Sequence, residues 1–258
     1  MCISEKFKLD GKVALVTGGA GLYGKQIVEA LAEAGAHTVM ASRDVNKLQA
    51  VTKLLQKRGL NVSAEQLDQG SEDSILSLLD RLTREVGRVD VLVNNAVLRT
   101  MKGWSCPSVN FTESMRVNAT GVFLMTRTFG KLMADRGGGS IINLGSIQGM
   151  VGPDFSLYEG LGMDAPPDYF FHKGGMLQLT RYAAAKLGPQ GVRVNTISPG
   201  GFLSDQSPEF VDRYNARTFL GRMANNDDLK GVIVFLASDA SAYITGVNIP
   251  VDGGYTAV

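Results

Sequence analysis

Short apolar runs alternate with amphipathic stretches along almost the whole chain. The run 12–17 (KVALVT) is too short for a helix, and the stretch 26–36 after it carries Ile27, Ala30, Leu31 and Ala34 on one helical face. The same pattern predicts further strands at 37–41, 61–67, 89–93, 140–144, 193–197 and 246–251, and helices at 46–58, 71–86, 112–135, 170–187 and 227–238. Continuous apolar strands joined by helices are typical of a parallel sheet covered on both faces. We therefore expect an α/β fold in one domain, 1–258: a Rossmann-type, doubly wound parallel sheet with helices on both faces.

Composition excludes several classes of partner. Lys and Arg number 26 against 25 Asp and Glu, so the net charge of +1 offers no basic field for nucleic acid. No run of 18 apolar residues predicts a membrane span, and residues 1–10 alternate in charge, unlike a secretory signal. The two cysteines have no metal-ligand spacing. We expect a cytoplasmic protein that acts on a small molecule and needs no metal.

A glycine-rich turn follows the first predicted strand. It reads TGGAGLYG over 17–24 and leads directly into a helix. Glycine lets the backbone approach a pyrophosphate, and a helix N-terminus offers free N–H groups to it. The position between the first strand and the first helix gives the motif its weight. We expect a dinucleotide to bind at Gly18, Gly21, Leu22, Tyr23 and Gly24.

The second predicted strand ends where the adenosine ribose of such a cofactor would lie. Ser42 and Arg43 favour the 2′-phosphate of NADP, because a guanidinium pairs with phosphate. A carboxylate binds the free 2′-hydroxyl of NAD, so Asp44 favours NAD unless its side chain instead caps the next helix. We prefer NADP(H) over NAD(H). Asp68 is placed to reach the adenine, and Asn95 is placed with its neighbour Ala96 to line the floor beneath the cofactor.

Residues at separated positions together match one known family. They are the turn 17–24, Asn94-Asn95-Ala96, Asn118, Ser146, Tyr169 with Lys173, the run 195–200 (NTISPG) and the run 251–254 (VDGG). In these residues the chain resembles the short-chain dehydrogenase/reductase family over nearly its whole length. The resemblance implies an enzyme, an oxidoreductase that moves a hydride between a nicotinamide dinucleotide and a carbonyl or secondary alcohol.

The resemblance also implies roles for single residues. Tyr169 would be the general acid/base, and Lys173, one helical turn later, would tune it and bind the nicotinamide ribose. Ser146 would orient the carbonyl, and Asn118 would hold a water of a proton relay. The cofactor-binding set is completed by Tyr169, Lys173, Pro199 and Gly200.

The chain departs from the family pattern at three places. Gly21 followed by Leu22 has the glycine spacing of the sugar-nucleotide branch, and Val97 replaces a usual glycine. The third departure is an active-site insertion at 147–168, whose extra residues 151–168 we call the lid. A fixed lid over the active-site mouth and a solvated surface bulge are the two interpretations. The lid also resembles oxidoreductases of flagellin-modification and nonulosonate pathways.

Polar residues indicate a sugar-like substrate, with an anionic group as an option. In the substrate loop 200–220 the candidates are Ser204, Arg213, Tyr214 and Arg217, and beyond the fourth strand they are Arg99 and Lys102. His172 is expected to diverge from Tyr169 on their shared helix. Two other functions stay open: a sugar or sugar-nucleotide isomerase or dehydratase with transient hydride transfer, and a non-catalytic dinucleotide sensor. The resemblance also implies a homo-oligomer, a dimer or homotetramer, through helices 112–135 and 170–187.

Overall fold

A parallel sheet lies at the centre of the computed structural model, which describes residues 2–257. Within these residues its strands are β1 (Val13–Thr17), β2 (His37–Ser42), β3 (Val62–Gln66), β4 (Val91–Asn94), β5 (Gly139–Leu144), β6 (Val192–Pro199) and β7 (Asn248–Val251). They lie in the order β3-β2-β1-β4-β5-β6-β7, and all six pairs of neighbouring strands are parallel. The order reverses between β1 and β4, and ligands bind at such a switch point, beyond the carboxyl ends of the strands. The expected Rossmann-type fold is confirmed.

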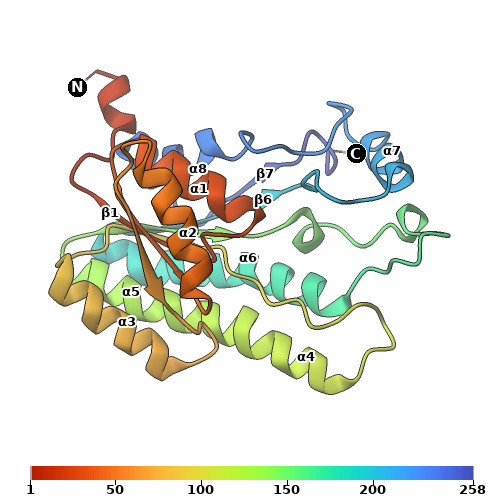
Figure 1. Ribbon diagram of the computed structural model, residues 1–258, viewed down its shortest axis with the longest axis horizontal. Coiled ribbons are helices and arrows are strands. Elements are labelled where there is room, and N and C mark those ends of the chain that lie inside the picture. The colour runs from red at the N-terminus through yellow and green to blue at the C-terminus, as the bar shows by residue number, and fades with distance from the viewer. Residues whose placement is uncertain (1, 258) are drawn as a thin grey trace.

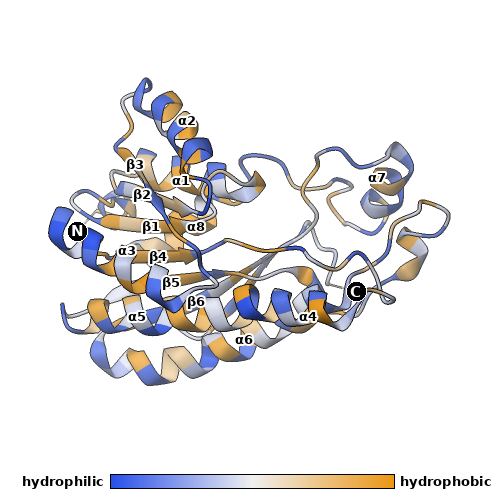
Figure 2. Ribbon diagram, turned by 60° about the horizontal axis from the view of Figure 1, so that its bottom comes forward, coloured by the Kyte–Doolittle hydropathy of each residue, from blue (hydrophilic) through white to orange (hydrophobic). Residues whose placement is uncertain are grey.

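Helices cover both faces of the sheet. One face carries α1 (Leu22–Glu33), α2 (Val45–Gln56) and α8 (Lys230–Ala237), and the other carries α3 (Glu72–Glu85), α5 (Val122–Ala134) and α6 (Pro167–Leu187) (Figure 1). Each face has its own buried apolar cluster, because strands such as β1 send alternate side chains to opposite faces. Figure 2 shows the apolar strands β1, β4 and β5 in the middle of the sheet. No helix in residues 2–257 combines the length and hydropathy that a membrane crossing requires.

Some element boundaries differ from those predicted. The helix expected at 112–135 begins earlier, as α4 (Ser108–Met115), and passes through a π-helical segment (Arg116–Gly121) into α5. A π-helical segment in a helix is frequently found at a functional site, and this one contains Asn118. The helix expected at 170–187 begins at Pro167, because proline is favoured in the first helical turn.

The substrate loop contains a helix that the sequence analysis did not predict. This helix, α7 (Pro208–Asn215), begins after Ser207, whose hydroxyl accepts a hydrogen bond from the Phe210 N–H at 3.3 Å. The lid packs against it: Leu157 is 3% exposed and lies in one apolar cluster with Phe210 and Tyr214. The lid is therefore anchored on α7 through a buried side chain. Its role as a cover of the active-site mouth stays a prediction.

Candidate active site

The glycine turn after β1 leaves no room for side chains at two positions. Gly18 has φ +68°, and a Cβ there would lie 2.9 Å from the Ala96 Cα. A Cβ on Gly24 would overlap the Gly18 carbonyl oxygen and lie 3.0 Å from the Gly19 Cα. Leu22, in contrast, is 59% exposed at the start of α1. The N–H groups of the first turn of α1 have no acceptor within the helix, so this turn fits a pyrophosphate.

Hydrogen bonds fasten this turn to the ends of β4 and β6. The Asn95 amide donates to the Thr17 carbonyl at 2.8 Å and to the Gly18 carbonyl at 3.0 Å. The Thr17 hydroxyl accepts from the N–H of Asn95 and of Ala96. Tyr23 donates its hydroxyl proton to the Gly200 carbonyl at 2.7 Å, directly after Pro199 at the end of β6. Predicted cofactor residues from three strands therefore share one edge of the sheet.

At the predicted ribose end, the carboxylate of Asp44 already accepts a hydrogen bond within the protein. Its Oδ1 accepts the Lys47 N–H at 3.0 Å and caps α2, and the Ser42 hydroxyl donates to its carbonyl at 3.2 Å. Arg43 is exposed and makes no ion pair within residues 2–257. Hydrogen bonds from two nitrogens of Arg116 lower the pKa of the nearby Glu113 carboxyl, and the charge of Arg43 adds a smaller effect in the same direction. The guanidinium of Arg43 is thus free for a ligand.

At the predicted adenine end, Asp68 lies just beyond β3. Its Oδ1 accepts the Gly70 N–H at 2.9 Å, and its own N–H donates to the Ser74 hydroxyl.

Tyr169 and Lys173 lie one turn apart near the start of α6. The Lys173 Nζ is 5.5 Å from the centre of the Tyr169 ring. Lys173 is 4% exposed and donates a hydrogen bond to the Leu144 carbonyl at the end of β5. Burial, and then the charge of Arg99, lowers the pKa of Lys173 to about 7. This pair is therefore fixed to the same edge of the sheet as the glycine turn.

Ser146 follows β5 by two residues and caps a short helical turn. Its Oγ accepts the Gln148 N–H at 3.1 Å. Gly149, at the end of this turn, packs so closely on α6 that a Cβ would lie 2.6 Å from the Lys173 carbonyl atoms. The Ser146 segment and the Tyr169 helix are therefore in direct backbone contact.

Asn118 lies in the π-helical segment, where its side chain holds the chain beyond β4. Its Oδ1 accepts the Leu98 N–H at 2.8 Å, and its Nδ2 donates to the Leu98 carbonyl at 2.7 Å and to the Ser114 hydroxyl at 3.0 Å. Both amide hydrogens are thus used within the protein, so only oxygen atoms of Asn118 remain for the expected water. Arg99, the residue after Leu98, places its guanidinium 5.1 Å from the centre of the Tyr169 ring.

His172 corrects an expectation, because it contacts Tyr169 instead of diverging from it. The two rings meet edge to face with centres 5.1 Å apart. Residues three apart are neighbours on a helix, which is the reason for the contact. His172 is 3% exposed, and neither ring nitrogen has a hydrogen-bond partner within residues 2–257. Burial, followed by the charges of Lys173 and Arg99, lowers its pKa to about 3, so the imidazole is neutral.

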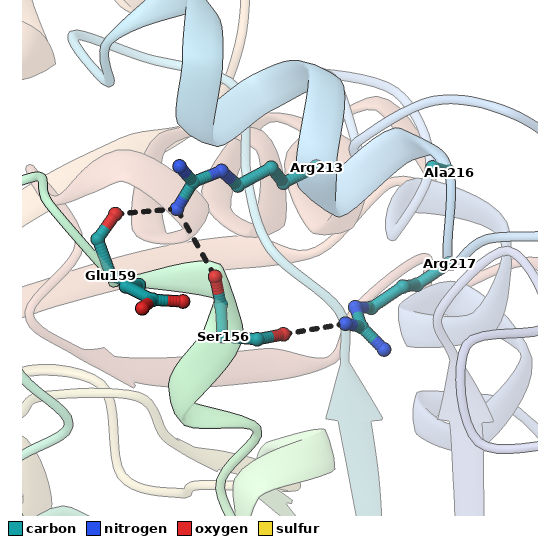
Figure 3. Close-up of a pocket in the computed structure, with 5 residues that line it drawn as sticks. All are labelled: Ser156, Glu159, Arg213, Ala216 and Arg217. Carbon is teal, nitrogen blue, oxygen red and sulfur yellow. Dashed lines mark hydrogen bonds between the residues drawn. The ribbon is translucent and has the colours of Figure 1, made fainter.

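The arginines expected to contact substrate from 200–220 are bound to the lid instead (Figure 3). Arg213 donates to the carbonyls of Ser156 at 3.1 Å and Glu159 at 2.7 Å. Arg217 pairs with Asp154 at 2.5 Å and donates to the Ser156 hydroxyl at 2.7 Å. The hollow lined by these residues lies between the lid and α7.

Of the other residues expected to contact the substrate, one is buried and two are exposed. Tyr214 is buried, and its hydroxyl accepts the Gly201 N–H at 2.5 Å. Ser204 and Lys102 are exposed. Within the part of the chain that the structure describes, no three His, Cys, Asp or Glu side chains gather as a metal site would need.

Comparisons with known proteins agree with this arrangement. The family model described as enoyl-(acyl carrier protein) reductase matches residues 22–256. The chain is 36% identical to D-threitol dehydrogenase of Mycolicibacterium smegmatis, over 99% of this chain and 97% of that protein. It is 32% identical to galactitol 2-dehydrogenase (L-tagatose-forming) of Cereibacter sphaeroides, over 97% of each.

A solved structure of similar fold is gluconate 5-dehydrogenase from Burkholderia cenocepacia in complex with NADP and tartrate. It covers the whole of both chains with a TM-score of 0.90 and 29% identity. With the family model and these relatives matching almost its full length, the protein belongs to the short-chain dehydrogenase/reductase family and is an NAD(P)-dependent oxidoreductase.

Proposed function

We propose that the substrate is a polyhydroxy, sugar-like molecule, oxidised at a secondary alcohol or reduced at the matching carbonyl. The observation that carries the proposal is the pair of Tyr169 and the buried Lys173, fixed to the sheet edge where the glycine turn lies. The names of the similar proteins, threitol, galactitol and gluconate dehydrogenases, support this substrate class. General acid–base catalysis of this kind typically increases the rate of the chemical step by about 10² to 10⁴.

The side chains have separate tasks in this proposal. Tyr169 donates its hydroxyl proton to the substrate oxygen in reduction and accepts it in oxidation. Lys173, with a pKa near 7, can take up and release a proton around neutral pH and so return the proton to Tyr169. Ser146 orients the same oxygen, and Asn118 holds the segment that carries Arg99. The bound nicotinamide dinucleotide supplies or accepts the hydride.

The test of this function is the variant Tyr169→Phe, which removes only the titrating hydroxyl. We expect kcat to fall by at least about 100-fold, while NADPH binding changes by less than about threefold. Tyr243→Phe, at a fully exposed tyrosine, is the matched control and should behave as wild type. Net oxidation or reduction of the cofactor also separates this function from a transient-hydride isomerase or dehydratase and from a sensor. Unchanged turnover in Tyr169→Phe would refute the assignment.

We also propose that NADP(H) is preferred over NAD(H). The support is the free guanidinium of Arg43 and the engagement of Asp44 as a helix cap. Arg43→Ala should weaken NADPH binding about 10- to 100-fold and leave NADH within about threefold, because a charge-assisted pair to phosphate is lost. Arg84→Ala, at an exposed arginine in the last turn of α3, is the control. Tighter binding of NADH than NADPH, unaffected by Arg43→Ala, would make Asp44 the ribose ligand.

We further propose that the protein is a homo-oligomer, a dimer or tetramer. Large apolar side chains are exposed on the helices predicted to form the contacts: Phe123 on α5, and Phe171 and Tyr182 on α6. Light scattering after size-exclusion chromatography measures the state directly. A monomer at micromolar concentration would contradict the proposal.

A further inference from the structure

We propose that Arg99 binds a carboxylate of the substrate, so that the substrate class is a sugar acid rather than a neutral polyol. The inference rests on the proposed function and extends it. The names of the similar proteins include neutral polyols and a sugar acid, so they do not choose between these classes. The choice comes from the surroundings of Arg99.

The backbone on both sides of Arg99 is clamped by asparagine side chains. Before it, Asn118 binds both the N–H and the carbonyl of Leu98. After it, the Thr100 hydroxyl donates to the Asn110 carbonyl at 2.6 Å, and the Asn110 amide donates to the Thr100 carbonyl at 2.8 Å. Both asparagines lie on the continuous helix formed by α4 and the π-helical segment. The position of Arg99 is thus fixed by a frame, unlike that of an ordinary surface arginine.

The guanidinium of Arg99 lies at the reacting phenol and is free to bind a ligand. It is 5.1 Å from the centre of the Tyr169 ring, and the side chain is exposed. Within residues 2–257 it has no ion-pair or hydrogen-bond partner. A guanidinium that contacts an aromatic face keeps its five N–H donors in its own plane, where they can bind a carboxylate with two parallel hydrogen bonds.

None of the four carboxylates of the lid, those of Asp154, Glu159, Asp164 and Asp168, forms an ion pair with Arg99 within residues 2–257. Asp154 is paired with Arg217, and Asp164 accepts the N–H groups of Trp104 at 3.1 Å and Ala165 at 2.7 Å. Asp168 precedes Tyr169 and is buried, 2% exposed. A substrate that reaches Tyr169 therefore meets a fixed positive charge, which favours an anionic group.

A carboxylate fits this site better than a phosphate does. Arg99 is a single guanidinium, and the imidazole beside it, His172, is neutral and buried. One guanidinium matches the single charge and two oxygens of a carboxylate, whereas a phosphate carries close to two charges and three oxygens. Sugar acids in which the carboxylate and the reacting carbon belong to one short chain are the substrates that this geometry favours.

The test compares substrates that differ only in the terminal group. Threitol is paired with threonate and glucitol with gluconate, and kcat/KM is measured for the complete enzyme with its cofactor. We expect the wild-type enzyme to prefer each acid at least tenfold. Arg99→Gln should reduce the acid-to-polyol ratio of kcat/KM by about 10- to 100-fold, mainly through KM, and Arg99→Lys should restore part of it. Arg136→Gln, at an exposed arginine between α5 and β5, should leave the ratio unchanged.

Each other outcome has a definite meaning. Equal losses on acid and polyol in Arg99→Gln would show that Arg99 acts only through Tyr169, and would overturn the inference. Turnover of polyols with no preference for acids would overturn it while leaving the proposed function intact. Preference for glucitol 6-phosphate over gluconate would replace the carboxylate by a phosphate. Absence of turnover with every acid and polyol would refute the proposed function itself, and the inference with it.

Discussion

Acidification should destabilise the folded protein, because His172 is buried in its neutral form. Its pKa in the folded protein is about 3, against an ordinary value of 6.5, because burial and the charges of Lys173 and Arg99 disfavour the imidazolium. Between these values the unfolded chain binds a proton that the folded protein does not. The contribution of His172 to stability is therefore complete above pH 6.5 and is lost as the pH falls towards 3. At pH 5 the loss is about 2 kcal/mol, from 1.5 pH units at about 1.4 kcal/mol each.

The chain has two histidines, which makes a direct measurement possible. Proton NMR follows both ring signals with pH, and His37→Gln identifies the signal of His37, a half-buried residue whose ring bonds the Ser63 hydroxyl. We expect the His172 signal to stay in its neutral position down to about pH 4. Urea unfolding at pH 7.5 and pH 5 should show an acid loss about 2 kcal/mol larger in wild type than in His172→Met. Titration of His172 near pH 6.5 would refute the reasoning.

Three further outcomes follow from contacts in the site. Gly24→Ala should abolish cofactor binding and destabilise the fold by about 1–3 kcal/mol, because the added Cβ overlaps Gly18. Gly175→Ala, in open space on α6, is the control and should have neither effect. Fluorescence titration measures cofactor binding, and thermal melts measure stability. Arg213→Met should increase hydrogen exchange in the lid at 154–160 by about tenfold or more, since two carbonyls lose their donor, and unchanged protection would contradict the proposed clamp. Removing the charge of Arg99 should raise the pKa of Lys173, so the pH–rate limb assigned to Lys173 should move to higher pH in Arg99→Gln. A pH–rate limb that does not move in Arg99→Gln would show that the charge of Arg99 does not affect the pKa of Lys173.

The glycine turn could be predicted because its signal is local. The strand, the turn and the helix follow one another in the chain, and the close approach of Gly18 to Ala96 requires glycine wherever this unit forms. The spacing of Tyr169 and Lys173 is local in the same sense, since one helical turn brings them together. The contact between Tyr169 and His172 was equally readable from their spacing of three, so its omission was an error of interpretation and not a limit of the sequence.

Other features could not be predicted because they depend on distant segments. Arg99 reaches Tyr169 only because asparagines on another helix hold its flanking residues. Arg213 and Arg217 had the appearance of substrate ligands, yet both bind the lid. The carbonyl oxygens that Arg213 contacts carry no signal in residue identity. The Ser207-Pro208 pair was a readable start signal for α7, but the pairing of α7 with the lid was not.

Four arginines near the site divide into two groups, and the division bears on specificity. Arg213 on α7 and Arg217 just after it donate hydrogen bonds to the lid, so they contribute to its shape. Arg43 and Arg99, at the carboxyl edge of the sheet, have exposed side chains and no ion pairs within residues 2–257. A solvated, unpaired charge contributes little to folding, so stability gives no reason for an arginine at either position. Binding of an anion at each of these positions gives one: a phosphate of the cofactor at Arg43 and a carboxylate of the substrate at Arg99.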